Sequence, residues 1–451
     1  MKALYQKSGA MAALIALAVT GAGCGGGNGG DAVEGTSGEG GAKPAETAGV
    51  DMSRLVTLRF WANPGKAIFD QEVGNRIKQK YPNVTIEFMD PSKKSLQDSM
   101  TELVTAGTMP DLIWLPNAAA VQTIKKLGVE YDLTELIKKN KFDLLRFDAA
   151  LLENVKSQGA KGEMYALPWQ SGPAAMFYNK DIFDKFGVGY PKDGMTWPEV
   201  LELGKTLTRM DGIQYRGFDP GLYNHFQEEY GIAAYDAKTN QAAFTTNPKW
   251  KTILEFLQQA YQFPGNYPAD KAIGADRSGF MKDKNVAMLP WAAYFQPFLE
   301  ARKEGLNFNI VSLPTWPDAK GQGSASVGAA LALTGTSKHK EEAFEILKFL
   351  VSDEVETANS RIGFAPAIHL QSAKDQFGKE LAGMENIRVS SVFYNKITPL
   401  PIVDPLLESV SQKPFFGTAI QAVGKGQKDV NTALREAQEA ANKAIQEEQK
   451  K

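Results

Sequence analysis

Residues 55–89, LVTLRFWANPGKAIFDQEVGNRIKQKYPNVTIEFM, decide the fold class. Leu55–Trp61 and Val84–Met89 have the composition and alternation of strands, and Lys66–Lys80 between them reads as a helix. A strand, a helix and a second strand in this order indicate parallel pairing, because parallel strands need a long crossover connection. Leu112–Leu115 reads as a further short buried strand. The chain therefore begins its folded part as an α/β unit.

A second α/β region follows in the same chain. Ala174–Asn179 and Val286–Leu289 read as strands, and Asn307–Leu313 as another. Thr196-Trp197-Pro198-Glu199 predicts a helix start, because it places a capping threonine, an early proline and a glutamate three residues on. The length of 451 residues suits two or three domains rather than one.

Composition excludes several classes of protein. The 50 basic and 52 acidic residues give a formal net charge of −2, which excludes a nucleic-acid binder held mainly by phosphate contacts. A single cysteine excludes a disulfide framework, a thiolate zinc site and an iron–sulfur cluster. The three histidines are far apart and share no metal-ligand spacing. We therefore expect no metal, no cofactor and no nucleic-acid partner.

The start of the chain has the pattern of an export signal. Lys2 and Lys7 precede ten apolar residues, 10–19, and small residues lead directly to Cys24. This resembles a bacterial lipobox, which implies removal of residues 1–23 and acylation of Cys24; Gly21 stands where an aliphatic residue is usual. An ordinary secretory cleavage site is the alternative. The Gly-rich stretch up to residue 53 predicts a flexible tether. We expect an extracytoplasmic lipoprotein at the cell membrane.

Three motifs in order carry a resemblance to a known family. They are GEMYALP at residues 162–168, MFYNKD at 176–181 and TWPE at 196–199. The chain from Arg54 onward resembles the bacterial extracellular solute-binding proteins of ABC importers, of the type that binds sugars. The resemblance implies an α/β, two-lobed periplasmic-binding-protein-like fold (type II) with three inter-lobe crossings. It also implies capture of a mono- or oligosaccharide by hinge closure, delivery to the membrane permease, and a monomer.

The crossings can be placed approximately on the sequence. We expect them near residues 167–172, 310–314 and 362–366. Lobe 1 then combines residues 54–168 with 314–362, and lobe 2 combines 169–313 with 363–451. Ligands of open α/β sheets sit beyond the carboxyl ends of the strands, so residues at strand ends and crossings are the candidates.

A sugar site needs aromatic plates for the apolar ring faces and polar side chains for the hydroxyl groups. The candidate plates are Trp61, Trp114, Trp169, Trp291 and Trp316, with Tyr223 in a loop of lobe 2. The candidate polar groups are Asn63, Asn117, Gln170 and Asp219. For each tryptophan the competing interpretation is a core aromatic. For Asp219 it is a turn residue that serves backbone geometry.

Two other functions compete with a binding protein. A secreted glycosidase would also carry aromatic plates and paired carboxylates, but no hydrolase, metalloprotease or phosphate-loop motif occurs in the sequence. A structural surface protein predicts repeats, and none occurs. A binding protein for a polar solute other than a sugar remains open. We expect no catalytic residue.

Overall fold

The computed structural model describes residues 50–91, 94–221, 224–236, 238–267, 273–274, 276–324, 328–399, 410 and 414–450. The chain divides into Met1–Ala48 and Gly49–Lys451, and every element below belongs to the second unit. The expected signal segment, Cys24 and Tyr223 lie outside the described residues. Within the described residues, no helix is both long and apolar enough to cross a bilayer.

The first sheet has five strands in the order β2-β1-β3-β13-β4. β1 (Val56–Ala62) pairs in parallel with β2 (Val84–Met89) and β3 (Leu112–Leu115), as the strand–helix–strand order predicts. β13 (Ala330–Leu333) is antiparallel to both β3 and β4 (Leu167–Pro168). The carboxyl ends of β1, β3 and β4 therefore share one edge with the amino end of β13.

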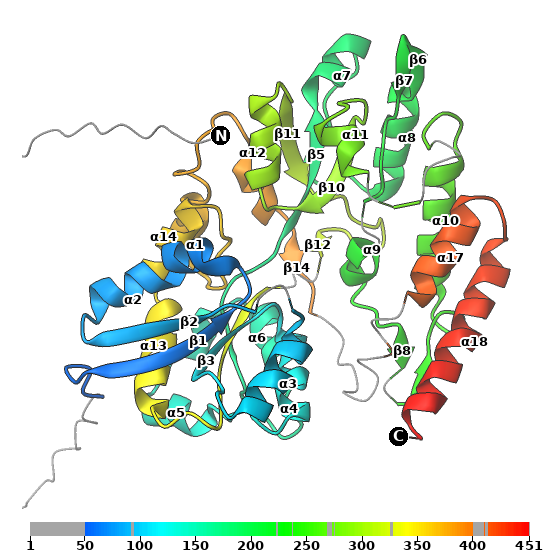
Figure 1. The fold of residues 1–451 in the computed structure, drawn as a ribbon. Coiled ribbons are helices and arrows are strands. Elements are labelled where there is room, and N and C mark those ends of the chain that lie inside the picture. Colours follow the sequence, from blue (N-terminus) through cyan, green and yellow to red (C-terminus); the bar gives the residue numbers. More distant parts are fainter. Residues whose placement is uncertain are drawn as a thin grey trace, which may run out of the picture. The chain divides into compact units, whose positions relative to one another are not determined.

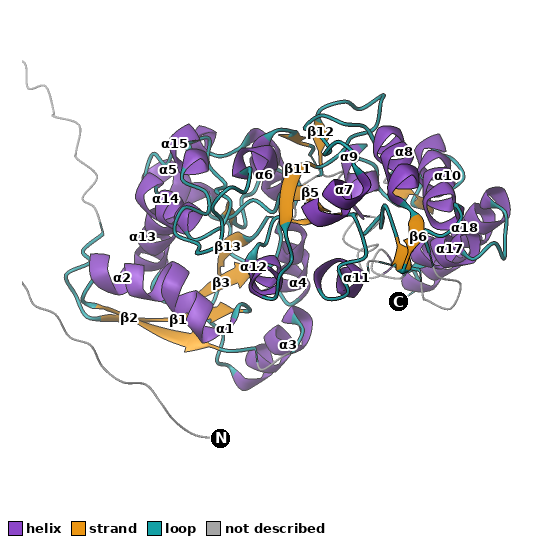
Figure 2. Cartoon of the chain, turned by 90° about the horizontal axis from the view of Figure 1, so that it is seen from above, coloured by secondary structure: helices purple, strands orange, loops and turns teal. Residues whose placement is uncertain are grey.

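Helices flank this sheet and complete the first hydrophobic core (Figures 1 and 2). The helix predicted over residues 66–80 is present, but its middle turn, which holds Glu72, is π-helical. In chain order the helices are α1 (Gly65–Phe69), η1 (Asp70–Gly74), α2 (Asn75–Lys80), α3 (Leu96–Ala106), η2 (Ala118–Ala120), α4 (Val121–Lys126), α5 (Thr134–Lys139), η3 (Leu144–Arg146), α6 (Ala149–Lys156), α13 (Lys340–Leu350) and α14 (Asp353–Arg361).

The second sheet has β5 (Ala174–Asn179) between β10 (Met288–Ala292) and β11 (Phe308–Ser312), both antiparallel to it. Alternate residues of β5 enter different cores: Met176 and Tyr178 belong to the second core, Ala175 and Phe177 to the third. Both faces of this strand are therefore buried, which explains its almost uninterrupted apolar sequence.

The remaining elements surround the second sheet or connect the two sheets, and α17 and α18 pack against each other near the C-terminus (Figure 1). The helices are α7 (Lys180–Phe186), α8 (Trp197–Leu207), α9 (Asn224–Glu229), α10 (Pro248–Gln262), α11 (Arg277–Met281), α12 (Gln296–Lys303), α15 (Gln371–Asp375), η4 (Val389–Phe393), α17 (Phe415–Gly424) and α18 (Val430–Glu448). The short paired strands are β6 (Arg209–Asp211) with β7 (Ile213–Tyr215), β8 (Tyr235–Asp236) with β9 (Gln241–Ala242), and β12 (Gln322–Gly323) with β14 (Lys396–Ile397).

Three segments connect the sheets or their cores, and we call them the crossing segments. The first is residues 169–173, between β4 and β5. The second precedes β13. Leu313 and Trp316 pack in the second core, so the chain leaves this core only after β12. The third is residues 362–369, in which Ala365 packs in the third core and Ala367 in the first.

The crossing segments touch one another. Gln170 forms an isolated β-bridge with Pro366, which joins the first and third segments. Gly328 approaches the first segment so closely that a Cβ atom at this position would lie 2.0 Å from the carbonyl oxygen of Gln170. No side chain fits at residue 328 without a shift of one backbone. The three segments therefore form one packed unit.

Candidate functional site

A small hollow lies at the shared edge of the first sheet, where β3, β4 and β13 meet. We call it the edge pocket; its volume is about 180 Å³. It is lined by Asn117, Ala118, Ala119, Leu151, Asn154, Val155, Pro168, Gln170, Gly328, Ala329 and Ala330. Asn117 caps η2, because its Oδ1 accepts the Ala120 N–H at 2.9 Å. The structure thus brings together two predicted residues, Asn117 and Gln170, and no lining residue is charged.

Three predicted tryptophans lie in the core behind this edge. Trp61, Trp114 and Trp169 are all buried, and the rings of Trp114 and Trp169 meet edge to face at 5.8 Å. The indole Nε1 atoms of Trp61 and Trp169 have no hydrogen-bond partner among the described residues. Asn63, which follows β1, is exposed. In this arrangement the tryptophans support the edge through packing and do not present open ring faces to solvent.

A buried glutamate that sequence reasoning missed holds Gln170 in place. The amide nitrogen of Gln170 donates a hydrogen bond to Glu72 of η1. Burial raises the pKa of Glu72 to about 8, while the bond from Gln170 and the charge of Arg76 oppose this rise. Burial therefore favours the neutral acid form of Glu72. One signal was available in the sequence: Glu72 lies three residues after Phe69, on the apolar face of a predicted helix.

The second sheet contributes Trp291 near the carboxyl end of β10. Trp291 pairs with Ala175, one residue from the point where the first crossing segment enters β5. Its ring is partly buried, and the Arg277 guanidinium lies 4.9 Å from the ring centre. Gly221 packs so closely against this strand that a Cβ atom there would lie 2.6 Å from the Pro290 carbonyl oxygen. Its φ of +69° also favours glycine at this position. Of the candidate plates that the structure describes, Trp291 is the one that keeps solvent contact.

Asp219 is fully buried, and protein groups surround its carboxylate. Oδ2 accepts from Arg216 Nη2 at 3.0 Å and from the Asp276 N–H at 3.1 Å, and Oδ1 accepts from the Gly221 N–H at 2.9 Å. Arg216 also forms an ion pair with Asp276 at 2.6 Å. The carboxylate thus fixes the loop that approaches β10.

Trp316 is buried in the second core. Its Nε1 donates to the Phe226 carbonyl oxygen at 3.0 Å, and its ring stacks on Tyr230 with 5.2 Å between ring centres. Both contacts come from residues in and next to α9. Trp316 is therefore a core residue that precedes the second crossing segment in the chain.

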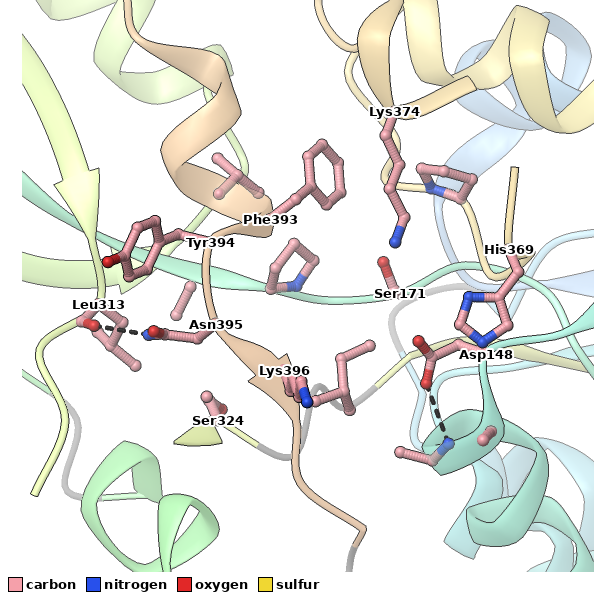
Figure 3. Close-up of a pocket in the computed structure, with 18 of the residues that line it drawn as sticks. Asp148, Ser171, Leu313, Ser324, His369, Lys374, Phe393, Tyr394, Asn395 and Lys396 are labelled. Atoms are coloured by element: carbon pink, nitrogen blue, oxygen red, sulfur yellow. Dashed lines mark hydrogen bonds between the residues drawn. The ribbon is translucent and has the colours of Figure 1, made fainter. Parts of the chain in front are cut away.

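A larger hollow of about 620 Å³ lies around the crossing segments, and we call it the hinge pocket (Figure 3). It is lined by Asp148, Ala149, Ala150, Glu153, Ser171, Pro173, Ala174, Leu313, Gly323, Ser324, Pro366, Ile368, His369, Lys374, Ser391, Val392, Phe393, Tyr394, Asn395, Lys396, Ile397 and Pro399. None of the predicted site residues lines it. Sequence reasoning missed it because its walls come from five stretches that are far apart in the chain.

The first crossing segment separates the two hollows. Gln170 lines the edge pocket, whereas Ser171 and Pro173 line the hinge pocket. Successive side chains of an extended chain point to opposite sides, so the two pockets lie on different sides of this segment.

The polar groups of the hinge pocket come from both sides of the crossing segments. Asp148 caps α6, since its Oδ1 accepts the Ala150 N–H at 3.0 Å, and Asn395 donates to the Leu313 carbonyl oxygen at 2.7 Å (Figure 3). Lys374 lies 5.7 Å from the centre of the Phe393 ring. Among the described residues, neither Lys374 nor Lys396 forms an ion pair.

The described residues contain no group of three histidine, cysteine, aspartate or glutamate side chains placed to bind a metal ion. Residues 72–385 match the family described as bacterial extracellular solute-binding protein. The chain belongs to this family.

Relatives and solved structures agree with this assignment. The arabinooligosaccharide-binding protein of Bacillus subtilis is 24% identical over 327 residues, which cover 68% of this chain and 72% of that protein. The sn-glycerol-3-phosphate-binding periplasmic protein of Rhizobium meliloti is 24% identical over 315 residues, which cover 63% and 68%. A sugar transporter of Rhizobium etli, solved in an open conformation, superposes with a TM-score of 0.70 at 22% identity and covers 85% of this chain and 98% of its own. The two-lobed α/β fold class predicted from the sequence is confirmed.

The two pockets of this solute-binding protein differ in charge. The edge pocket offers amide groups from Asn117 and Gln170 and apolar walls, which suits a neutral polar molecule. The hinge pocket carries charged side chains of both signs, because Lys374 and Lys396 line it together with Asp148 and Glu153. The chemistry of the solute therefore distinguishes the two locations.

Proposed function

We propose that this solute-binding protein captures a mono- or oligosaccharide outside the cytoplasm and delivers it to the permease of an ABC importer, without chemical change. The observation that carries the proposal is the uncharged edge pocket. It lies at the carboxyl ends of the parallel strands of the first sheet, where ligands of such sheets bind. Hydroxyl groups pair well with Asn117 and Gln170. The names of the relatives, which include an arabinooligosaccharide-binding protein, support a carbohydrate.

Trp291 and the edge pocket form the proposed solute site, with the two lobes as its halves. The ring of Trp291 supplies an apolar plate for a sugar face. The buried Trp61, Trp114 and Trp169 position the edge beneath, Asn63 lies at the end of β1, and Asp219 fixes the loop beside β10. Each half offers few contacts alone, so the solute stabilises the closed arrangement by its differential affinity.

A thermal-shift screen over mono- and oligosaccharides tests this function. A sugar present at about 100 times its dissociation constant should add about 2.7 kcal/mol to the free energy of unfolding. Trp291→Ala should abolish the shift, while Lys374→Ala in the hinge pocket should leave it intact. Formation of a sugar product during incubation would instead identify a glycosidase, and the absence of any shift would contradict the carbohydrate proposal.

An anionic polyol is the second candidate solute. It is suggested by Lys374 and Lys396, which form no ion pair among the described residues and line the hinge pocket together with Asp148 and Glu153, and by the glycerol-phosphate-binding relative. In the same screen, sn-glycerol-3-phosphate would then produce the shift, and Lys374→Ala rather than Trp291→Ala would remove it. The two variants thus decide between the two pockets.

We propose further that Cys24 is acylated and anchors a monomer to the cell membrane through the tether of residues 24–53. The support is the short apolar run that ends directly before Cys24. Cys24→Ala should release the protein from the membrane fraction. Release of wild-type protein to the same extent would show an ordinary cleavage site instead.

A further inference from the structure

Each crossing segment is contacted by a different buried glutamate. Glu72 of η1 accepts a hydrogen bond from the Gln170 side chain in the first segment. Glu228 of α9 accepts one from the Ser324 hydroxyl, which begins the passage to β13. Glu356 of α14 accepts the Ala367 N–H of the third segment at 3.1 Å. Two of these glutamates come from the first core region and one from the second.

All three carboxyl groups are withdrawn from water. The exposed fractions of Glu72, Glu228 and Glu356 are 0%, 7% and 2%. One oxygen of Glu72 and one of Glu356 have no hydrogen-bond partner among the described residues. A buried carboxylate without a cation in contact costs far more free energy than the neutral acid, which carries only the smaller cost of an unpaired hydroxyl group. The geometry therefore fits the protonated form.

The charged groups around these acids do not compensate a negative charge directly. Arg76 is near Glu72 but donates to Asn359 at 3.1 Å, and its other charged neighbours are Glu354 and Glu380. Among the described residues, no salt bridge reaches Glu72. Burial outweighs the charge of Arg76 and raises the pKa of Glu72 to about 8.

The surroundings of Glu356 and Glu228 are similar. Arg146 faces Glu356 but pairs with Asp353 at 2.5 Å, and burial raises the pKa of Glu356. Burial also raises the pKa of Glu228 to about 7. Its buried neighbour Glu229 accepts the Trp197 indole N–H at 2.8 Å. His225 on the same helix is buried, and its pKa falls to about 4, so it stays neutral.

We propose that Glu72, Glu228 and Glu356 are positioning residues that hold the crossing segments together while they carry their protons, so that solute affinity falls as the pH rises above neutrality. The inference rests on the proposed function, because the crossing segments connect the two halves of the proposed site. Ionisation drives a buried carboxylate toward water and loosens the segment to which it is bonded. A loosened segment must be ordered again when the solute binds, and this ordering lowers affinity.

The packing of the crossing segments makes the effect collective. The bridge between Gln170 and Pro366 and the close contact of Gly328 with Gln170 link all three segments. Movement at one glutamate therefore disturbs the contacts of the other two.

Calorimetric titration of the best sugar from the screen, between about pH 6 and pH 9, tests the proposal. The dissociation constant of the wild type should rise, by at most about tenfold per pH unit for each proton released. The variants Glu72→Gln, Glu228→Gln and Glu356→Gln keep the accepting oxygen but do not titrate. Each should reduce the pH dependence, and the triple variant should remove it. Glu87→Gln, at an exposed position of β2, serves as the control and should behave as the wild type.

A second measurement needs no solute. Hydrogen exchange at the Ser171 and Ala367 amides, corrected for the intrinsic effect of pH, should lose protection in the wild type above about pH 8 and keep it in the triple variant. Affinity and protection that do not change with pH in the folded wild type would overturn the proposal. If no sugar binds but protection falls with pH as described, the proposed solute is wrong and the role of the glutamates stands.

Discussion

Replacement of Asp219 by alanine shows whether this carboxylate stabilises the fold or binds the solute. Asp219 was a candidate for solute contact, but its oxygens accept hydrogen bonds from Arg216, Asp276 and Gly221, and both Asp219 and Arg216 are buried. Asp219→Ala removes these bonds and leaves the guanidinium of Arg216 with Asp276 as its one charged partner among the described residues. We therefore expect a loss of stability that is independent of any solute.

The expected magnitude follows from the burial of the pair. Removal of one partner of a buried ion pair costs about 3–5 kcal/mol, because a charge is left with insufficient compensation. With an m-value of about 3 kcal/mol/M, the urea midpoint should fall by about 1 M or more. Circular dichroism during urea titration, without solute, measures this shift.

The matched control is Asp318→Ala. Asp318 forms an exposed ion pair with Lys249 and accepts a hydrogen bond from Tyr230 at 2.9 Å. Exposed pairs contribute about 0–1 kcal/mol, so its midpoint should hardly change. An Asp219→Ala protein with an unchanged midpoint but no solute binding would refute the structural reasoning and make Asp219 a ligand group.

Three further outcomes follow from other contacts. Because burial raises the pKa of Glu72 from 4.5 to about 8, the folded state holds a proton that the unfolded state releases. As the pH rises between these values, the free energy of unfolding of the wild type should therefore fall by about 1.4 kcal/mol per pH unit relative to that of Glu72→Gln. Urea midpoints of the two proteins that change with pH in the same way would contradict this. Gly328→Ala should destabilise by about 1–3 kcal/mol through its clash with the Gln170 carbonyl, whereas Gly189→Ala, with open space around it, should not; equal thermal midpoints would refute the close approach. Trp197→Phe removes the hydrogen bond to Glu229 and should lower the free energy of unfolding by about 1–3 kcal/mol, as measured by urea titration. An unchanged urea midpoint would disprove this expectation.

Local patterns in the sequence predicted the local structure well. The capping sequence of α8 forms as expected, with the Thr196 N–H donating to Glu199 at 2.7 Å. The parallel pairing of β1 with β2 followed from the helix between them. Trp197 and Trp250, which lie at the starts of α8 and α10, are both fully buried. Such features depend on contacts within a few turns of chain, where periodicity and capping act.

Long-range pairing was not visible in the same way. β13 lies between β3 and β4, although it follows them by more than a hundred residues in the chain. The position of Trp316 in the second core depends on stacking with Tyr230, which no local pattern announces. The sequence shows that an acidic residue, Glu72, lies on the apolar face of a predicted helix, but it does not show the hydrogen bond from Gln170. Each of these results from tertiary packing, which overrides local preference.

The placement of the tryptophans has a consequence for spectroscopy. Six of the seven, all except Trp291, are buried with at most 6% exposure. Their emission reports on the integrity of the interior, so it should shift to longer wavelength only on unfolding. Trp291 alone retains solvent contact in the folded chain. The difference between the emission spectra of the wild type and Trp291→Phe therefore isolates one fluorophore, and quenching of that difference by iodide can follow solute capture without any attached dye.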